Sequence, residues 1–461
     1  MKKRIAGIIL FTLVFAAACF ITPGEKMPDD IFKALAVLVL AIILWVAEPV
    51  PTGAAAVLIM VLPLLLGIRS FKDTIQPFAN STVFFVIATF GLSAAISKLP
   101  LAKRILLFLL NIFGSSIEKI IFAIMAATAF ISSVMSNIPA ALMFMGVSLN
   151  LLELYDSDED KRRTGRAVMI ALPAASMIGG TMTPAGSSNN ILALDLLEAN
   201  SGVIVTFLDW MIVCIPVVIV MLPAAWFLII KIYSPAPIDK EKLDSFIAEL
   251  KILPKPQKQE YLLIAISAAM ILFWILGSFF PFIDTTVVAI IGLIAMFLPG
   301  VDLFTWKEFE NEVSWSAILM VGSVLCIGSL IRDTGAASWF ASIFFRFDAD
   351  GSLFALILKL AVFMYIMQVI LPNGPAAITT TVVPVIAAAS AAGLNPAVLV
   401  IPLTIFCSWA MILPLNPVPM LTYSSGYYKI TDISKAGIPL LAILMFVLAL
   451  WIPFISGILF Q

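Results

Sequence analysis

Uncharged apolar runs of membrane-spanning length recur from one end of this 461-residue chain to the other. A helix rises 1.5 Å per residue and the hydrocarbon core of a bilayer is about 30 Å thick, so one span needs about 20 mostly apolar residues. The composition agrees, because 62% of the residues are hydrophobic and only 12% are charged. We therefore predict an all-α polytopic membrane protein with about eleven transmembrane helices plus two re-entrant hairpins.

Several residue types that drive chemistry are missing or scattered. The chain contains no histidine, and its four cysteines stand singly in apolar runs, so no histidine or cysteine metal centre is expected. No P-loop pattern is found, which argues against ATP-driven transport by this chain. A formal net charge of −1 gives no reason to expect a nucleic-acid partner. We do not expect an enzyme.

Polar segments divide the chain. Met1-Lys2-Lys3-Arg4 precedes an uncharged run to Ile21, which is long enough to span and predicts a transmembrane helix rather than a cleaved signal sequence. The Lys- and Pro-rich stretch 234–260 predicts a linker with one short surface helix. The predicted domains are a first transmembrane helix at 1–30, a first repeat at 31–233, a cytoplasmic linker at 234–260 and a second repeat at 261–461.

Each predicted repeat holds a pair of short apolar pieces followed by an interrupted apolar run. Asn137 and Asn373 lie at the breaks between the paired pieces and are 236 positions apart, and the two interruptions are 230 apart. Corresponding Gly- or Pro-broken segments in two halves indicate the binding site of a transporter. The predicted elements are an inner hairpin at 118–153, a broken helix at 165–198, an outer hairpin at 353–392 and a broken helix at 396–424.

The distribution of basic residues predicts an orientation. Five crossings per repeat, with a non-crossing hairpin in each, turn the two repeats in opposite directions and so give an inverted repeat. With the N-terminus in the cytoplasm, most Lys and Arg residues fall in cytoplasmic segments, as the positive-inside rule requires. The C-terminus is then extracytoplasmic, and the hairpins enter from opposite faces and meet near mid-membrane.

The breaks carry groups suited to an anion and a small cation. The amides of Asn137 and Asn373 each offer one acceptor oxygen and two N–H donors. Pro139 suits the start of a helix, whose N-terminus carries free N–H groups and about half a positive charge. No Lys, Arg, Asp or Glu lies in 120–152, 167–194 or 360–428. Such a site can bind an anion together with Na⁺ and then empty without stranding a buried charge.

A purely structural role is the alternative for each of these residues. Asn is a favoured helix cap, so Asn137 or Asn373 taken singly could act only as a cap. Their matching positions in matched hairpins favour a binding role. For Ser132 and Ser187, packing between helices remains an equal alternative, and the glycines of 179–186 could also serve close packing.

Together these segments resemble the divalent anion/sodium symporter family, the INDY-type carriers of dicarboxylates, citrate and sulfate. The resemblance covers nearly the whole chain and implies an elevator-type transporter, a homodimer and one Na⁺ site in each repeat. The segments that carry it are 44–51 (Leu-Trp-Val-Ala-Glu-Pro-Val-Pro), 136–138 (Ser-Asn-Ile), 179–190 (beginning Gly-Gly and ending Asn-Asn), 372–374 (Pro-Asn-Gly) and 413–419 (Leu-Pro-Leu-Asn-Pro-Val-Pro).

The resemblance also implies particular binding residues. The implied first Na⁺ site is Ser132, Ser136, Asn137 and Gly186. The implied second Na⁺ site is Gln368, Leu371, Asn373 and Asn416, partly through backbone carbonyls. The implied substrate contacts are Asn137, Ile138, Ser187, Ser188, Asn373, Gly374 and Pro417.

The sequence departs from the family pattern at the hairpin tips. Ile138 and Gly374 stand where the family has threonines, Pro372 replaces the second tip serine, and Gln368 replaces a threonine one turn earlier. The first Na⁺ site keeps its side-chain oxygens, whereas the second loses most of them. We therefore expect weaker or altered Na⁺ coupling.

The predicted function is secondary active transport of small divalent anions across the cell membrane. The expected substrates are C4-dicarboxylates such as succinate or malate, or citrate, with Na⁺ as the coupling ion. The alternatives are a dicarboxylate exchanger with little or no Na⁺ coupling, transport of sulfate or another oxyanion, and an anion channel. The expected partners are thus the anion, membrane lipid and a second copy of the chain.

Overall fold

The computed structural model describes residues 2–460 except 22, 24–26, 115, 338, 340–351, 372–373 and 415. All secondary structure in this part of the chain is helical, which confirms the predicted all-α class. The first helices are α1 (Lys2–Phe20), α2 (Asp29–Ala47), α3 (Thr52–Leu65), α4 (Phe71–Ile75), the 3-10 turn η1 (Gln76–Phe78), α5 (Ser81–Lys98) and α6 (Leu101–Phe113).

Two lists complete the order of elements. The middle of the chain forms α7 (Ile117–Ser132), α8 (Asn137–Leu152), α9 (Asp158–Gly180), the 3-10 turn η2 (Pro184–Gly186), α10 (Ser188–Ser201), α11 (Phe207–Tyr233) and α12 (Lys240–Leu250). The remainder forms α13 (Lys258–Gly277), α14 (Thr285–Phe297), α15 (Trp306–Glu312), α16 (Trp315–Asp333), α18 (Leu353–Ile370), α19 (Gly374–Ala391), α20 (Ala397–Ser408), α21 (Pro417–Tyr423) and α22 (Ile430–Leu459).

The outer helices present apolar side chains on the surface of the molecule. Within the described residues, eight helices of at least 18 residues are apolar enough to cross a membrane. On α22, Leu450, Phe454 and Ile458 follow one another at intervals of four residues, and each is more than 60% exposed. Water would disfavour such a stripe, whereas lipid tails accept it. This is the surface of a multi-pass membrane protein.

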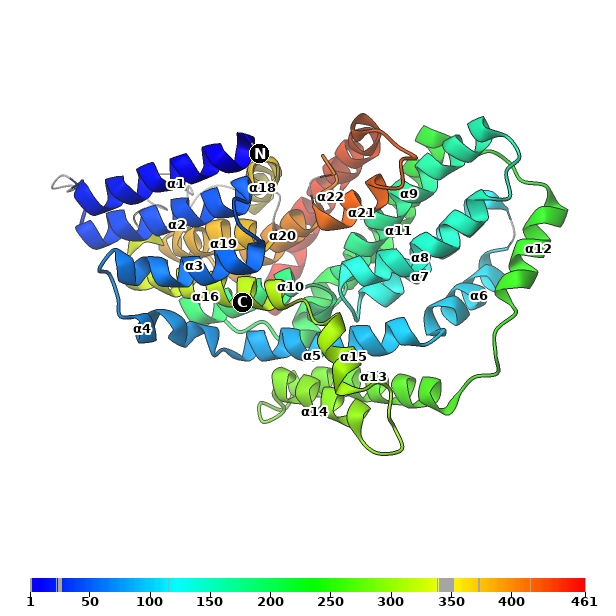
Figure 1. Ribbon diagram of the computed structural model, residues 1–461, viewed down its shortest axis with the longest axis horizontal. Coiled ribbons are helices and arrows are strands. Elements are labelled where there is room, and N and C mark those ends of the chain that lie inside the picture. Colours follow the sequence, from blue (N-terminus) through cyan, green and yellow to red (C-terminus); the bar gives the residue numbers. More distant parts are fainter. Residues whose placement is uncertain are drawn as a thin grey trace.

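The broken helices lie at the centre of the molecule. Every residue of α20 is buried, as is α9 from Ala167 to Gly180. α9 packs against α7 and α8, and α10 packs against α19 and α20. Around them, α1 lies beside α2, α3 packs on α16, and α5 packs on α14 (Figure 1). The segments interrupted by Gly, Ser and Asn are therefore enclosed by protein, as unpaired backbone in a membrane must be.

The predicted domain boundaries can be placed beside these helices. The segment predicted as a linker contains α12, close to the surface helix expected there. The predicted inner hairpin contains α7 and α8, and the predicted outer hairpin contains α18 and α19. The division into two inverted repeats and the elevator mechanism stay predictions.

Candidate functional site

The first helix break is held open by side chains of its own segment. α9 ends at Gly180, and α10 begins at Ser188. The amide nitrogen of Asn190 donates to the carbonyl oxygens of Gly180 (2.8 Å) and Thr183 (3.0 Å). The Thr183 hydroxyl in turn donates to the carbonyl oxygen of Ser133, in the tip of the hairpin. These bonds satisfy carbonyls that a continuous helix would have paired.

The tip of the α7–α8 hairpin contacts this break through Asn137. The Ser132 hydroxyl lies 2.7 Å from Asn137 Oδ1 and donates to the Ser176 carbonyl at 2.8 Å. The same end of the Asn137 amide lies 3.2 Å from the carbonyl oxygens of Ser176 and Gly186. Gly180 permits this approach, since a Cβ there would lie 2.1 Å from Asn137 Oδ1.

This cluster suits a small cation. The partners around that end of the amide are a hydroxyl and two carbonyls, so oxygen faces oxygen unless the amide turns its nitrogen towards them. Hydroxyl, carbonyl and amide oxygens are the ligands that hard cations prefer. Three of the four residues predicted for the first Na⁺ site thus lie together, Ser132, Asn137 and Gly186. Ser136, the fourth, immediately precedes α8 and lines the cavity beside the cluster.

A central cavity of about 460 Å³ lies next to the Asn137 cluster. Three helices of 14 or more residues, α8, α10 and α19, begin at its wall with Asn137, Ser188 and Gly374. Their N-termini turn positive dipole ends to one space, and at α10 the N–H groups of Asn189 and Asn190 already donate to Ser187. The residues predicted to contact substrate that line it are Asn137, Ile138, Ser187, Ser188, Gly374 and Pro417, while Asn373 lies outside the described residues.

The charges around the cavity are sparse. Among its described lining residues there is no Lys or Arg, and the one ionisable side chain is the exposed Glu312. Sequence reasoning missed Ser176, Asn189 and Ser408. The sequence could have indicated Ser176, because it lies one helical turn before Gly180, where α9 breaks. Asn189 and Ser408 reach the cavity through tertiary packing, which sequence spacing does not reveal.

The predicted second Na⁺ site has a different arrangement. Gln368 is buried, and its amide nitrogen donates to the Phe406 carbonyl, while its amide oxygen has no hydrogen-bond partner among the described residues. Leu371 ends α18 with its N–H bonded to Met367 O, and Asn416 caps α21 by accepting from Val418 N at 3.3 Å. Because Asn373 lies outside the described residues, this set stays a prediction.

A hydrogen bond joins the two helix breaks directly. The indole N–H of Trp409, just after α20, donates to the Thr181 hydroxyl at 3.0 Å. A second indole, that of Trp210 on α11, donates to the Thr181 carbonyl at 2.9 Å. All three residues are buried. Thr181 therefore ties the first break to the second and to the neighbouring helix α11.

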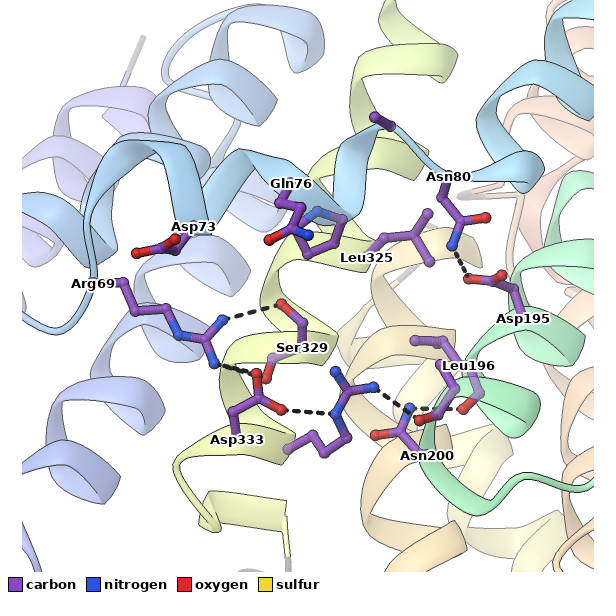
Figure 2. A pocket seen from close by; sticks show the side chains of 14 residues that line it. Arg69, Asp73, Gln76, Asn80, Asp195, Leu196, Asn200, Leu325, Ser329 and Asp333 are labelled. Atoms are coloured by element: carbon purple, nitrogen blue, oxygen red, sulfur yellow. Dashed lines mark hydrogen bonds and ion pairs between the residues drawn. The ribbon is translucent and has the colours of Figure 1, made fainter.

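A second, more polar cavity of about 560 Å³ lies further along two of the same helices, α10 and α16 (Figure 2). Along α16 the central cavity is lined by the first residues of the helix and the polar cavity by the last. α10 runs from one to the other, with Ser188 in the first and Asp195 in the second. Asn80, the cap of α5, donates to Asp195 at 3.2 Å across this space.

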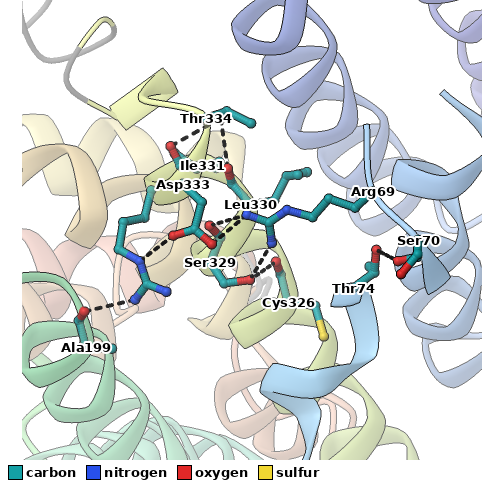
Figure 3. A network of polar contacts seen from close by, with 11 residues as sticks. Arg69, Ser70, Thr74, Ala199, Cys326, Ser329, Leu330, Ile331, Asp333 and Thr334 are labelled. Carbon is teal, nitrogen blue, oxygen red and sulfur yellow. Dashed lines mark hydrogen bonds and ion pairs between the residues drawn. The ribbon is translucent and has the colours of Figure 1, made fainter. Parts of the chain in front are cut away.

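Asp333 binds two arginines in the polar cavity (Figure 3). Its carboxylate pairs with Arg69 at 2.6 Å and with Arg332 at 2.8 Å. Arg69 also donates to the Ser329 carbonyl and hydroxyl, and Arg332 donates to the Ala199 carbonyl at the end of α10. This network fixes the end of α10 against α16.

We expect replacement of Asp333 by alanine to destabilise the protein by about 1–3 kcal/mol, because two guanidinium groups lose their shared partner. A single exposed ion pair contributes about 0–1 kcal/mol. Glu153→Ala, which removes such a pair with Lys161, is the control. Thermal unfolding of the purified protein in detergent measures both variants, and equal losses would contradict the network's role.

Comparison with known proteins agrees with this architecture. The family described as "Sodium:sulfate symporter transmembrane region" matches residues 2–459. Two similar relatives are sodium-dependent dicarboxylate transporters named SdcS. The one from Staphylococcus saprophyticus is 23% identical, over 99% of this chain and 92% of its own. The one from Staphylococcus aureus strain USA300 is 24% identical, with the same coverage.

Two solved transporter structures share the fold at low identity. MtrF of Neisseria gonorrhoeae superposes with a TM-score of 0.60 at 14% identity, over 96% of this chain and 97% of that chain. YdaH of Alcanivorax borkumensis gives a TM-score of 0.54 at 13% identity, over 83% of this chain and 88% of that chain. These likenesses concern the fold alone.

The family match over nearly the whole chain, together with these relatives, makes the protein a multi-pass secondary transporter rather than an enzyme. The chain belongs to the sodium:sulfate symporter family, which the resemblance of its sequence had indicated. Membership implies a small anion as substrate and supports the predicted use of Na⁺.

Proposed function

We propose that the chain carries a C4-dicarboxylate together with Na⁺ through the central cavity. The observation that carries this proposal is the convergence of α8, α10 and α19, by their N-termini, on one cavity whose described lining has no basic side chain. Helix N-termini stabilise an anion through backbone N–H groups and dipoles. They leave no fixed charge behind when the anion departs, which suits a site that must fill and empty.

The cavity is large enough for the proposed substrate. Its volume of about 460 Å³ falls within the roughly 300–1,000 Å³ of small-molecule sites. Ser187 and Ser188 add hydroxyl donors at the start of α10, and Asn137 adds an amide at the start of α8. The relatives named for dicarboxylate transport support this substrate class over a single inorganic anion.

The Asn137 cluster is the proposed cation site. Ser132, Asn137 and the carbonyls of Ser176 and Gly186 would hold Na⁺. When bound, the ion supplies positive charge beside a dianion. Asn137 belongs both to this cluster and to the cavity wall, so its amide would lie between the bound cation and the bound anion. Cation and anion would therefore favour one another's binding.

Three further features belong to the proposal. The resemblance supports a homodimer in the cell membrane, embedded in lipid, with elevator movement of the hairpins and broken helices past a fixed scaffold. The Lys and Arg distribution supports a cytoplasmic N-terminus and an extracytoplasmic C-terminus. On that orientation Glu312, at the central cavity, belongs to the cytoplasmic side.

Uptake into proteoliposomes tests the function. Labelled succinate, citrate and sulfate are each offered with an inward Na⁺ gradient, with K⁺ in place of Na⁺, and with unlabelled substrate inside. We expect succinate uptake that depends on the Na⁺ gradient and is accelerated by internal substrate, as a carrier requires. Uptake of sulfate alone would contradict the dicarboxylate assignment, and flux without counterflow would indicate a channel.

A further inference from the structure

Asn189 is a polar side chain of the central cavity that neither the sequence pattern nor the resemblance assigns to substrate. It is the second residue of α10, next to Ser188, and only 9% of it is exposed. Its backbone N–H donates to the Ser187 hydroxyl at 3.3 Å. Its side chain lines the cavity together with Gly374 of α19.

The missing side chain of Gly374 makes room for the Asn189 amide. A Cβ at Gly374 would lie 2.4 Å from Asn189 Nδ2 and 2.9 Å from Oδ1. At the corresponding place in the first hairpin, after its tip asparagine, stands the apolar Ile138. The second hairpin therefore contributes no side chain at this point, and the space holds a carboxamide from the first broken helix instead.

The amide oxygen of Asn189 is a hydrogen-bond acceptor without a donor partner among the described residues. Its Oδ1 is shielded from water and has no hydrogen-bond partner in the described part of the chain. The hydroxyl of Ser408, on the same cavity, is likewise buried without a partner. A buried unpaired acceptor is costly, and a carboxylate cannot relieve it because a carboxylate only accepts. Once the side chain turns to expose Oδ1, a ligand hydroxyl can both donate to Oδ1 and accept from Nδ2.

We propose that Asn189 makes the cavity selective for hydroxylated C4-dicarboxylates, with its carboxamide hydrogen-bonded to the substrate hydroxyl. This inference rests on the proposed function and narrows it. Asn189 lies beside Ser187 and Ser188 at the α10 N-terminus, so one carboxylate of the substrate can bind that N-terminus while the neighbouring hydroxyl meets the amide. Rotation about the Cβ–Cγ bond turns either end of the amide to the ligand.

A hydroxyl in the matching configuration should improve binding by about 5- to 100-fold over hydrogen, because a site built to pair with a hydroxyl discriminates against its absence. Only one enantiomer of malate places its hydroxyl at a fixed amide while its carboxylates keep their places. The other enantiomer has the same size and charge, so it serves as an internal control.

Calorimetric titration of the purified full chain at saturating Na⁺ tests the inference with succinate, L-malate and D-malate. We expect one malate enantiomer to bind at least five-fold more tightly than both succinate and the other enantiomer. In Asn189→Ala and in the volume-conserving Asn189→Leu, this preference should fall to about one, while succinate still binds. Asn200→Ala on the same helix, whose amide bonds to Leu196 O in the other cavity, should keep the preference.

The outcomes separate the inference from the function on which it rests. Equal binding of succinate and both malates, or a preference that survives in both Asn189 variants, overturns the role of Asn189 and leaves dicarboxylate transport standing. Binding of none of the three overturns both.

Discussion

We expect Asn137→Ala to abolish Na⁺-driven uptake, with initial rates at least about 100-fold below those of the unchanged protein. The amide of Asn137 faces Ser132, Ser176 and Gly186 on one side and lines the central cavity on the other. Its removal takes a ligand from the proposed cation site and a donor from the anion site together. Loss of one hydrogen bond to the charged substrate, at about 1.5–3 kcal/mol, together with loss of one Na⁺ ligand, accounts for this magnitude.

The matched control for this variant is Asn150→Ala. Asn150 lies on the same helix, α8, with its side chain exposed and away from the central cavity. We expect full uptake in that variant and an unchanged size-exclusion profile in both. Substantial uptake by Asn137→Ala, at more than about a tenth of the normal rate, would contradict the assignment of Asn137 to both sites.

We expect Gly179→Ala to move the first hairpin helix, α7, away from the first broken helix, α9. A Cβ at Gly179 would lie 2.1–2.5 Å from the backbone atoms of Ala129 in α7, where no side-chain movement can relieve the clash. The backbones of α7 and α9 would have to move apart. We expect a loss of stability at or above the usual 1–3 kcal/mol of overpacking, seen as a lower midpoint of thermal unfolding in detergent.

Gly146→Ala is the control for this packing. Gly146 lies in α8, and nothing stands within 4 Å of the position that its Cβ would take. The same substitution there should leave the midpoint unchanged or raise it slightly, since alanine favours helix over glycine. Equal midpoints for the two variants would show that the α7–α9 contact does not depend on Gly179.

The sequence predicted the class of fold because a bilayer imposes a length. Apolar runs of about 20 residues can satisfy their backbone in lipid only as helices, so the all-α polytopic class followed from composition and spacing. The break at 179–190 was recognisable for the same reason, because Gly, Ser and Asn at membrane depth require protein around them. The structure encloses this segment, with Gly179 and Gly180 buried.

Contacts between distant segments could not be predicted in the same way. Periodicity indicates which face of a helix is buried but not which helix it meets. The bond from Trp409 to Thr181 and the contact between Asn189 and Gly374 join positions about 200 residues apart. The polar cavity likewise gathers Arg69, Asp195 and Asp333 from three separated elements.

The predicted site residues illustrate both cases. Ser132, Asn137 and Gly186 were proposed together from a resemblance, and the structure brings Asn137 within hydrogen-bonding range of both Ser132 and Gly186. For Gln368 the resemblance gave a position but not the orientation of the amide, whose nitrogen donates to Phe406 O.

The central claim is that one cavity binds a dicarboxylate in concert with Na⁺ at the Asn137 cluster. Calorimetric titration of the purified protein with malate over a series of Na⁺ concentrations, at constant ionic strength with K⁺, tests it directly. We expect the Kd for malate to fall steadily as Na⁺ rises and then to level off, because binding of the two ligands is reciprocally linked. A Kd that is the same without Na⁺ and at saturating Na⁺ would contradict it.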